Sequence, residues 1–153
     1  VPVVGAKAAG VKAMNLKEDD VLQSAFICNT SSFYLLTQRG SLKRVSIEEI
    51  PATSRAKRGL QVLRELKNKP HRVFLAGAVV EQGFVGDLFR TEVDGNDQTL
   101  LVQSNKGTIY EIRLQDLNLS ERTSNGSFIS DTISDEEVFD AYLQEVYTEL
   151  ESN

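Results

Sequence analysis

The stretch TQRGSLKRVSIEEI, residues 37–50, recurs in altered form 67 residues later as SNKGTIYEIRLQDL, residues 104–117. In this alignment Gly40 falls on Gly107, and basic, aliphatic and acidic positions match on either side of the glycine. Each copy places aliphatic and β-branched residues around a turn that contains glycine, which is the pattern of a β-hairpin. We therefore expect Gly40 and Gly107 to adopt positive φ angles in tight turns.

The same offset places Gly59 on Gly126, and a shorter match at an offset of 49 places Gly10 on Gly59. The repeated unit therefore starts near residues 10, 59 and 126. A repeat of about 50 residues built from short strands is typical of a radial, bladed β-sheet. We predict an all-β, propeller-like fragment of repeated four-stranded blades over residues 1–130, because a plain β-sandwich would explain the strands but not the repeat.

The predicted strands are short runs rich in aliphatic, β-branched and aromatic residues, bounded by turn residues. They are residues 21–28, 33–37, 42–47, 72–80, 84–93, 99–103 and 108–114.

The last 23 residues, 131–153, differ in kind from this body. They contain 8 of the 22 acidic residues and no basic residue. Ser134 and Glu137 have the spacing of a helix capping box, and apolar residues then follow from Phe139 to Leu150 at helical intervals. We predict an acidic C-terminal tail that contains an amphipathic helix over residues 134–150.

Charge is distributed unevenly along the chain, although the net charge is -5. Residues 33–72 carry ten basic side chains and three acidic ones. A local excess of positive charge attracts phosphate even when the whole chain is acidic. Clustered charge can equally serve only to keep a surface soluble, so this pattern by itself leaves both interpretations open.

Several functional classes are excluded or gain no support from the sequence. One cysteine and one histidine rule out an internal disulfide and a zinc cage of Cys and His ligands. The longest apolar run, residues 74–80, is too short to span a bilayer. No catalytic constellation is present, so we expect a binding module or a scaffold without a cofactor. Because the chain starts on Val1, we expect it to be part of a larger protein.

Four segments together carry a family resemblance: AAGVKAMNLKEDD, TQRGSLKRVSIEEI, TSRAKRG and LQVLREL. They are similar to blades of the C-terminal β-pinwheel of bacterial type IIA topoisomerase A subunits. Within this family the chain resembles the topoisomerase IV type more than the gyrase type, because a gyrase box is absent. The resemblance covers roughly residues 5–130.

The resemblance implies a non-catalytic domain that binds and bends duplex DNA through its phosphates. In this family the domain presents DNA to the breakage-reunion core during decatenation and relaxation. The catalytic residues and the sites for ATP and Mg lie elsewhere in the enzyme, whose partners include the ATPase B subunit. The implied location is the bacterial cytoplasm, on the chromosome. No small-molecule substrate and no transmembrane segment are implied.

By motif match, the resemblance assigns DNA contact to basic residues of one hairpin and of the loop that follows it. These are Arg39, Lys43, Arg44, Arg55, Lys57 and Arg58, followed by Lys12 and Lys106. The alternative function is a bladed β scaffold that binds protein partners through its rim, as propellers can. DNA binding that weakens steeply with salt would separate the two functions.

Overall fold

The computed structural model describes residues 12–54, 56–80, 84–86, 91–93, 98–144 and 147–149, and the regular structure of these residues consists of short strands and 3₁₀ turns. The strands are β1 (Ser32–Thr37), β2 (Ser41–Ser46), β3 (Val73–Val79), β4 (Phe84–Gly86), β5 (Thr91–Val93), β6 (Thr99–Ser104), β7 (Ile109–Arg113), β8 (Ser127–Phe128), β9 (Val138–Gln144) and β10 (Tyr147–Glu149). The 3₁₀ turns are η1 (Ile47–Glu49), η3 (Leu114–Asp116) and η4 (Thr132–Asp135). The prediction of an all-β fold is confirmed.

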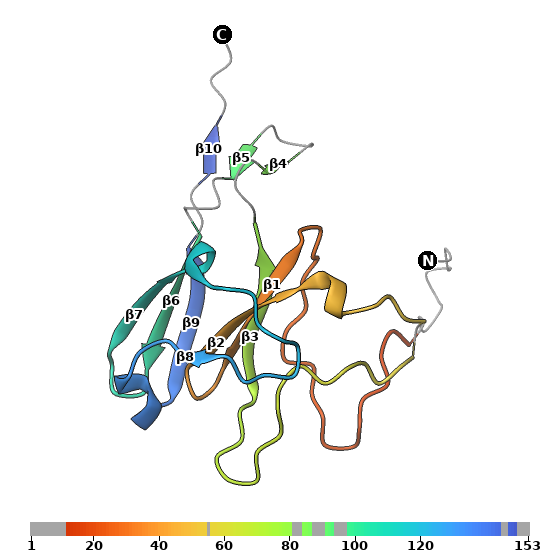
Figure 1. The fold of residues 1–153 in the computed structure, drawn as a ribbon, viewed down its shortest axis with the longest axis horizontal. Helices are drawn as coiled ribbons and strands as arrows, with labels where there is room; N and C mark the ends of the chain where they lie inside the picture. Colours follow the sequence, from red (N-terminus) through yellow and green to blue (C-terminus); the bar gives the residue numbers. More distant parts are fainter. Residues whose placement is uncertain are drawn as a thin grey trace, which may run out of the picture.

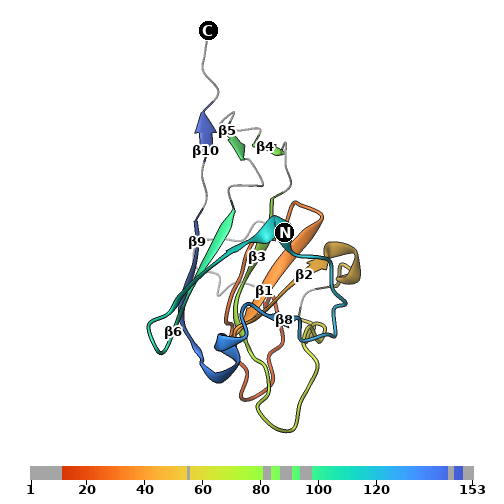
Figure 2. The ribbon, with the colours of Figure 1, turned by 60° about the vertical axis from the view of Figure 1, so that its left-hand side comes forward.

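The strands form three antiparallel sheets (Figure 1). The first has the order β3-β1-β2-β8, the second β7-β6-β9 and the third β10-β5-β4. Figure 2 shows the first two sheets as neighbouring layers. Side chains of Tyr34 and Leu36 on the first sheet and of Leu100 and Val102 on the second belong to one buried cluster. This cluster is the core, and burying its apolar surface holds the two sheets together.

The two main sheets are copies of one structural unit. Strand β6 begins 67 residues after β1, and η3 begins 67 residues after η1. The third strands, β3 and β9, pair with β1 and β6 through registers that shift at the same place, after Leu36 and after Gln103. The sequence repeat is therefore a structural repeat, and the prediction of repeated blades is confirmed.

Neighbouring units exchange a strand. Strand β8 follows β7 in the chain, yet it pairs with β2 of the preceding unit, with Ser127 opposite Leu42 and Phe128 opposite Ser41. The exchanged strand completes the first sheet as its fourth member. This four-stranded sheet is thus assembled from residues that are far apart in the sequence.

Four glycines at repeated positions adopt the positive φ angles that favour glycine. Gly40 and Gly107 have φ values of 83° and 85° in the hairpins, as predicted. Gly126 has a φ of 71° just before the exchanged strand β8, and Gly59, at the matching place in the repeat, has 85°. At Gly126 an added Cβ would lie 2.6 Å from the carbonyl oxygen of Leu42. This glycine is therefore required both for its backbone angle and for the close approach of β8 to β2.

The prediction of a helix over residues 134–150 is wrong for the described part of that range, residues 134–144 and 147–149. Residues 132–135 form the short 3₁₀ turn η4, and residues 138–144 form strand β9, which pairs with β6 along its whole length. Residues 131–144 are therefore part of the second blade and not a separate tail. The missed signal is an offset of 65: VFLAGAV in β3 and VFDAYLQ in β9 share Val, Phe and Ala at the same places.

Two predicted strands differ from the structure. Within the predicted strand 84–93, residues 84–86 and 91–93 form two strands, β4 and β5, which pair with each other, and residues 87–90 lie outside the described residues. Residues 21–28 adopt no ladder pairing, although they lie along β3. Their described bonds to β3 come from side chains, Gln23 Nε2 to the carbonyl of Phe74 and Ser24 Oγ to that of Ala76. Without a backbone ladder to join, an apolar stretch does not form a strand.

Candidate nucleic-acid interface

Three of the predicted basic residues meet where two distant loops join. The backbone amide of Asn15 donates to the carbonyl of Lys57 at 3.0 Å, and that of Ala56 donates to Ala13 at 3.1 Å. These bonds bring Lys12 close in the fold to Lys57 and Arg58. We call Lys12, Lys57 and Arg58 the basic loop cluster.

The basic loop cluster is open to solvent. All three side chains are exposed, and within the described ranges none has an ion-pair or hydrogen-bond partner. The positive φ angles of Ala56 (62°) and Gly59 (85°) turn the backbone sharply on both sides of Lys57 and Arg58. Exposed cations without partners can contact phosphates without first breaking another interaction.

Lys43 occupies a different environment from the one expected of a phosphate contact. Lys43 is only 2% exposed. Its ammonium donates to four backbone carbonyls, those of Val62, Glu121, Arg122 and Ser124. The distances to the oxygens of Arg122 and Ser124 are both 2.7 Å. An ammonium has three N–H donors, so these acceptors use all of them.

The surroundings of Lys43 also change its acidity. Burial lowers its pKa to about 8, the Glu49 carboxylate raises it, and the Arg122 guanidinium lowers it by a smaller amount. Burial and saturated donors remove Lys43 from the candidate interface. Its side chain instead ties β2 to the loop that precedes the exchanged strand β8.

Arg39 is held by its neighbours in the fold. Its guanidinium lies 5.4 Å from the centre of the Phe128 ring, and its Nη1 donates to the carbonyl of Lys69 at 2.8 Å. Nη1 also lies 3.1 Å from Nε2 of His71. Because a guanidinium only donates, that ring nitrogen must accept, and burial followed by the charge of Arg39 lowers the pKa of His71. Arg39 therefore fastens β8 to the first hairpin.

Arg44, Lys106 and Arg55 complete the predicted set. Arg44 is half-buried, and its Nε donates to Ser32 Oγ at 2.8 Å. Lys106 is exposed in the turn between β6 and β7, where the neighbouring Asn105 amide bonds to the carbonyl of Glu137. Arg55 lies outside the described residues. The structure thus brings together Lys12, Lys57 and Arg58 but places Lys106 apart from them, in the turn between two strands of the second sheet.

The segment after the cluster carries exposed cations that the motif match did not select: Arg64, Lys67, Lys69 and Arg72. The loop that contains Arg122 holds this segment, since Nη1 of Arg122 donates to the carbonyl of Gln61 at 2.6 Å and Asn125 Oδ1 accepts from the amide of Arg64 at 2.8 Å. The surplus of charge over residues 33–72 was the sequence signal for these cations.

The described residues contain no group of three or more His, Cys, Asp or Glu side chains that could hold a metal ion. In the same part of the chain, no helix is long and apolar enough to cross a membrane.

Comparison with known proteins places the chain in a family. The profile of the family described as DNA gyrase C-terminal domain, beta-propeller, matches residues 1–29 and 32–79, which is half of the chain. The chain belongs to this DNA gyrase C-terminal domain family. This is a non-catalytic domain of type II topoisomerase A subunits, and the catalytic core lies outside the matched region.

The chain is similar to A subunits of DNA topoisomerase 4 from several bacteria. The A subunit of DNA topoisomerase 4 from Streptococcus pneumoniae is 95% identical over 97% of the chain, and that from Bacillus subtilis is 46% identical over 86%. The chain spans only 18% and 14% of the lengths of these two relatives. The crystal structure of the C-terminal domain of DNA topoisomerase IV matches with a TM-score of 0.73 and 37% identity, covering 95% of this chain and 41% of that one. The resemblance stated from the sequence is confirmed.

Proposed function

We propose that the chain binds the phosphate backbone of duplex DNA as a domain of the topoisomerase IV A subunit, with the basic loop cluster as the principal contact. The observation that carries the proposal is the exposure of Lys12, Lys57 and Arg58, unpaired within the described residues, on a domain of this family. Arg44 and the exposed cations of residues 64–72 extend the positive surface, with Lys106 as a weaker, separate contact.

In the intact enzyme, this contact bends a duplex and presents it to the breakage-reunion core for decatenation and relaxation. The partners are then the catalytic core of the same polypeptide and the ATPase B subunit, and the enzyme acts on the chromosome in the bacterial cytoplasm. The names and high identity of the relatives support this context.

The test is fluorescence anisotropy of a labelled duplex of about 30–40 base pairs with the full 153-residue chain at several salt concentrations. Each lost phosphate contact lowers the log–log salt slope by about 0.9. The variant Lys57→Glu/Arg58→Glu should therefore bind at least about tenfold more weakly, with a slope smaller by about 2.

The matched control is Lys106→Glu compared with Lys57→Glu, because each changes the net charge equally. Lys106 lies in the turn between β6 and β7 and is not part of the basic loop cluster, so its reversal should weaken binding much less than that of Lys57. Equal effects of the two substitutions would show that net charge and not the basic loop cluster controls binding. An affinity for DNA that does not change with salt would contradict the phosphate contact itself.

A specific observation keeps the protein-binding alternative open for testing. Val21, Leu22 and Ile27 are 75%, 67% and 89% exposed, which leaves apolar side chains uncovered along β3. Replacing Val21 and Ile27 by Ser should leave DNA binding unchanged if DNA is the ligand of the basic loop cluster. Absence of DNA binding by the unmodified chain at low salt would favour the scaffold function.

A further inference from the structure

The hairpin between β1 and β2 holds the segment that leads into β3, and Gln38 is central to this contact. We call residues 69–72 of this segment the basic corner. The backbone amide of Gln38 donates to the carbonyl of Arg72 at 3.0 Å, and Oε1 of Gln38 accepts from the backbone amide of Arg72. Nε2 of Gln38 donates to the carbonyl of Pro70 at 2.7 Å. The side chain of Gln38 therefore acts like a short piece of neighbouring strand and fixes the backbone of the basic corner.

The residues on either side of Gln38 fix the rest of the basic corner. Arg39 Nη1 donates to the carbonyl of Lys69 at 2.8 Å. Nδ1 of His71 donates to Thr37 Oγ1 at 3.0 Å, because the other ring nitrogen accepts from Arg39. Lys69 has a φ of 49°, in the left-handed region that few residues other than glycine adopt. Such a conformation persists only where its surroundings hold it, and it is often found at functional sites.

The charged ends of the basic corner stay free while its backbone is fixed. The side chains of Lys69 and Arg72 are exposed, and among the described residues neither has an ion-pair or hydrogen-bond partner. A cation on a fixed backbone loses less conformational freedom on binding than one on a mobile loop. The basic corner is therefore suited to bind an anion with its side chains, and these side chains do not stabilise the fold.

The second sheet repeats this bonding pattern with the opposite charge. At the place of Gln38 in the repeat, the backbone amide of Asn105 donates to the carbonyl of Glu137 at 2.8 Å, and Oδ1 of Asn105 accepts from the amide of Glu137 at 3.2 Å. Residues 64–72 contain four basic side chains and one acidic one. Residues 129–137, at the matching place before β9, contain four acidic side chains and no basic one. The fold therefore uses the side-chain amide in both sheets but does not require the positive charge.

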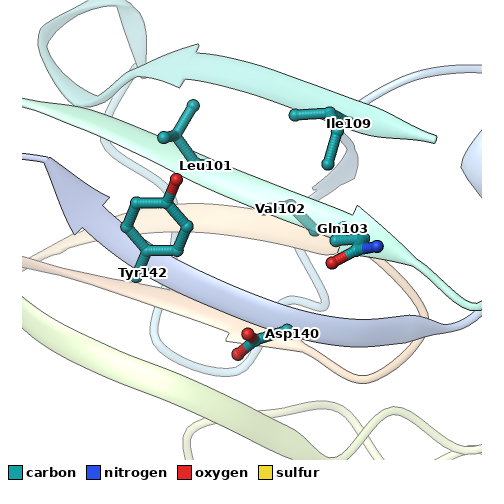
Figure 3. Close-up of a pocket in the computed structure, with 6 residues that line it drawn as sticks. All are labelled: Leu101, Val102, Gln103, Ile109, Asp140 and Tyr142. Carbon is teal, nitrogen blue, oxygen red and sulfur yellow. The ribbon is translucent and has the colours of Figure 1, made fainter. Parts of the chain in front are cut away.

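The negative charge of the second sheet continues beyond Glu137. A hollow of about 130 Å³ lies against β6, β7 and β9, and Asp140 is the only charged residue among the six that line it. Figure 3 shows this carboxylate in the same hollow as the uncharged side chains of Gln103 and Tyr142. The described lining of the hollow therefore offers a phosphate a negative charge and no cation.

We propose that Gln38 positions Lys69 and Arg72 to bind phosphates of duplex DNA, and that the matching corner of the second sheet, residues 134–137, lies outside the DNA path. The inference rests on the proposed DNA-binding function and adds which hairpin supports the contact. Gln38 is a positioning residue, because it holds the backbone of the basic corner while Lys69 and Arg72 contact the phosphates. Opposite charges at equivalent places in the repeat attract a duplex to the first sheet and repel it from the second.

The test is fluorescence anisotropy of a labelled duplex with the full 153-residue chain at several salt concentrations. Gln38→Met keeps an unbranched side chain but removes the side-chain amide, so Lys69 and Arg72 lose their fixed position. We expect this variant to bind DNA about three- to tenfold more weakly. Asn105→Leu removes the equivalent side-chain amide from the second sheet and should change the affinity less than about twofold. Equal losses in the two variants would show that these amides only stabilise the fold and would overturn the proposal.

A combined variant separates positioning from folding. Lys69→Gln/Arg72→Gln removes two exposed charges, so the log–log salt slope should become smaller by about 2. In this background Gln38→Met should have no further effect on DNA affinity, because the side chains through which Gln38 acts are no longer charged. A further loss as large as that in the unmodified chain would contradict the positioning role.

The same titrations distinguish failure of this inference from failure of the proposed function. If Lys57→Glu/Arg58→Glu weakens binding but Lys69→Gln/Arg72→Gln leaves the salt slope unchanged, only the role of the basic corner and of Gln38 is overturned. Absence of salt-sensitive DNA binding by the unmodified chain would overturn both.

Discussion

The contact between Lys43 and the loop before β8 can be tested by replacing Lys43 with methionine. Methionine keeps an unbranched side chain but removes every N–H donor. The carbonyls of Val62, Glu121, Arg122 and Ser124 then lose a charged partner.

The loss of stability in Lys43→Met depends on which of these carbonyls can form a hydrogen bond to water instead. Glu121 is exposed, so its carbonyl can be hydrated, but Val62 and Ser124 belong to half-buried residues. A buried acceptor without a partner costs about 1–3 kcal/mol, and removing the buried charge offsets part of this loss. We expect Lys43→Met to lower the free energy of unfolding by about 2–4 kcal/mol. At about 2–4 °C per kcal/mol for a domain of this size, Tm should fall by about 4–16 °C.

Thermal unfolding followed by circular dichroism at pH 7 measures this change, and Arg44→Met is the matched control. Arg44 follows Lys43 in β2 and makes one described side-chain bond, to Ser32 Oγ. Its replacement should cost about 1 kcal/mol or less. The interpretation of Lys43 as a structural contact would be refuted by a Tm equal to that of the unmodified chain. A loss no larger than that of Arg44→Met would contradict it as well.

Three further predictions concern stability. The pKa of Lys43 is about 8 in the folded chain, against 10.5 for a free lysine. Between about pH 8 and 10.5 the unfolded chain therefore binds more protons than the folded chain. As a result, the free energy of unfolding should rise as the pH rises through this range. Urea unfolding at pH 7.5 and 10 should show this slope in the unmodified chain and not in Lys43→Met. Gly126→Ala, with its Cβ 2.6 Å from a backbone oxygen, should destabilise more than Gly59→Ala, where the cost is about 1 kcal/mol; equal melting temperatures would contradict the close packing at β8. Val138 is 8% exposed in the core, so Val138→Asp should lower the free energy of unfolding by about 3 kcal/mol or more. Its neighbour Phe139 is 68% exposed, so Phe139→Asp should lower it by about 1 kcal/mol or less. Calorimetry can measure both changes.

Local features of the fold were predictable from the sequence because they depend on neighbouring residues. The hairpins around Gly40 and Gly107 need a residue that tolerates positive φ, and glycine marks them in the sequence. Both the strands and the 3₁₀ turns that follow them recur at the 67-residue offset that the sequence shows. Strand β9 was predicted as a helix because its apolar residues also fit helical spacing, and only pairing with β6 decides between the two.

For the candidate interface too, some features were predictable from the sequence and others depended on tertiary packing. The sequence by itself determined the repeated β-units, the surplus of positive charge in residues 33–72 and the family resemblance. The sequence could not show that Lys43 and Lys57 have different roles, since both are lysines in basic stretches near a recurring turn of the repeat. Only the tertiary structure decided that one ammonium is enclosed by carbonyls, three of which come from residues 121–124, while the other faces water. The physical reason is that burial and hydrogen bonding depend on what packs against a side chain, and here that partner lies about 80 residues away in the sequence.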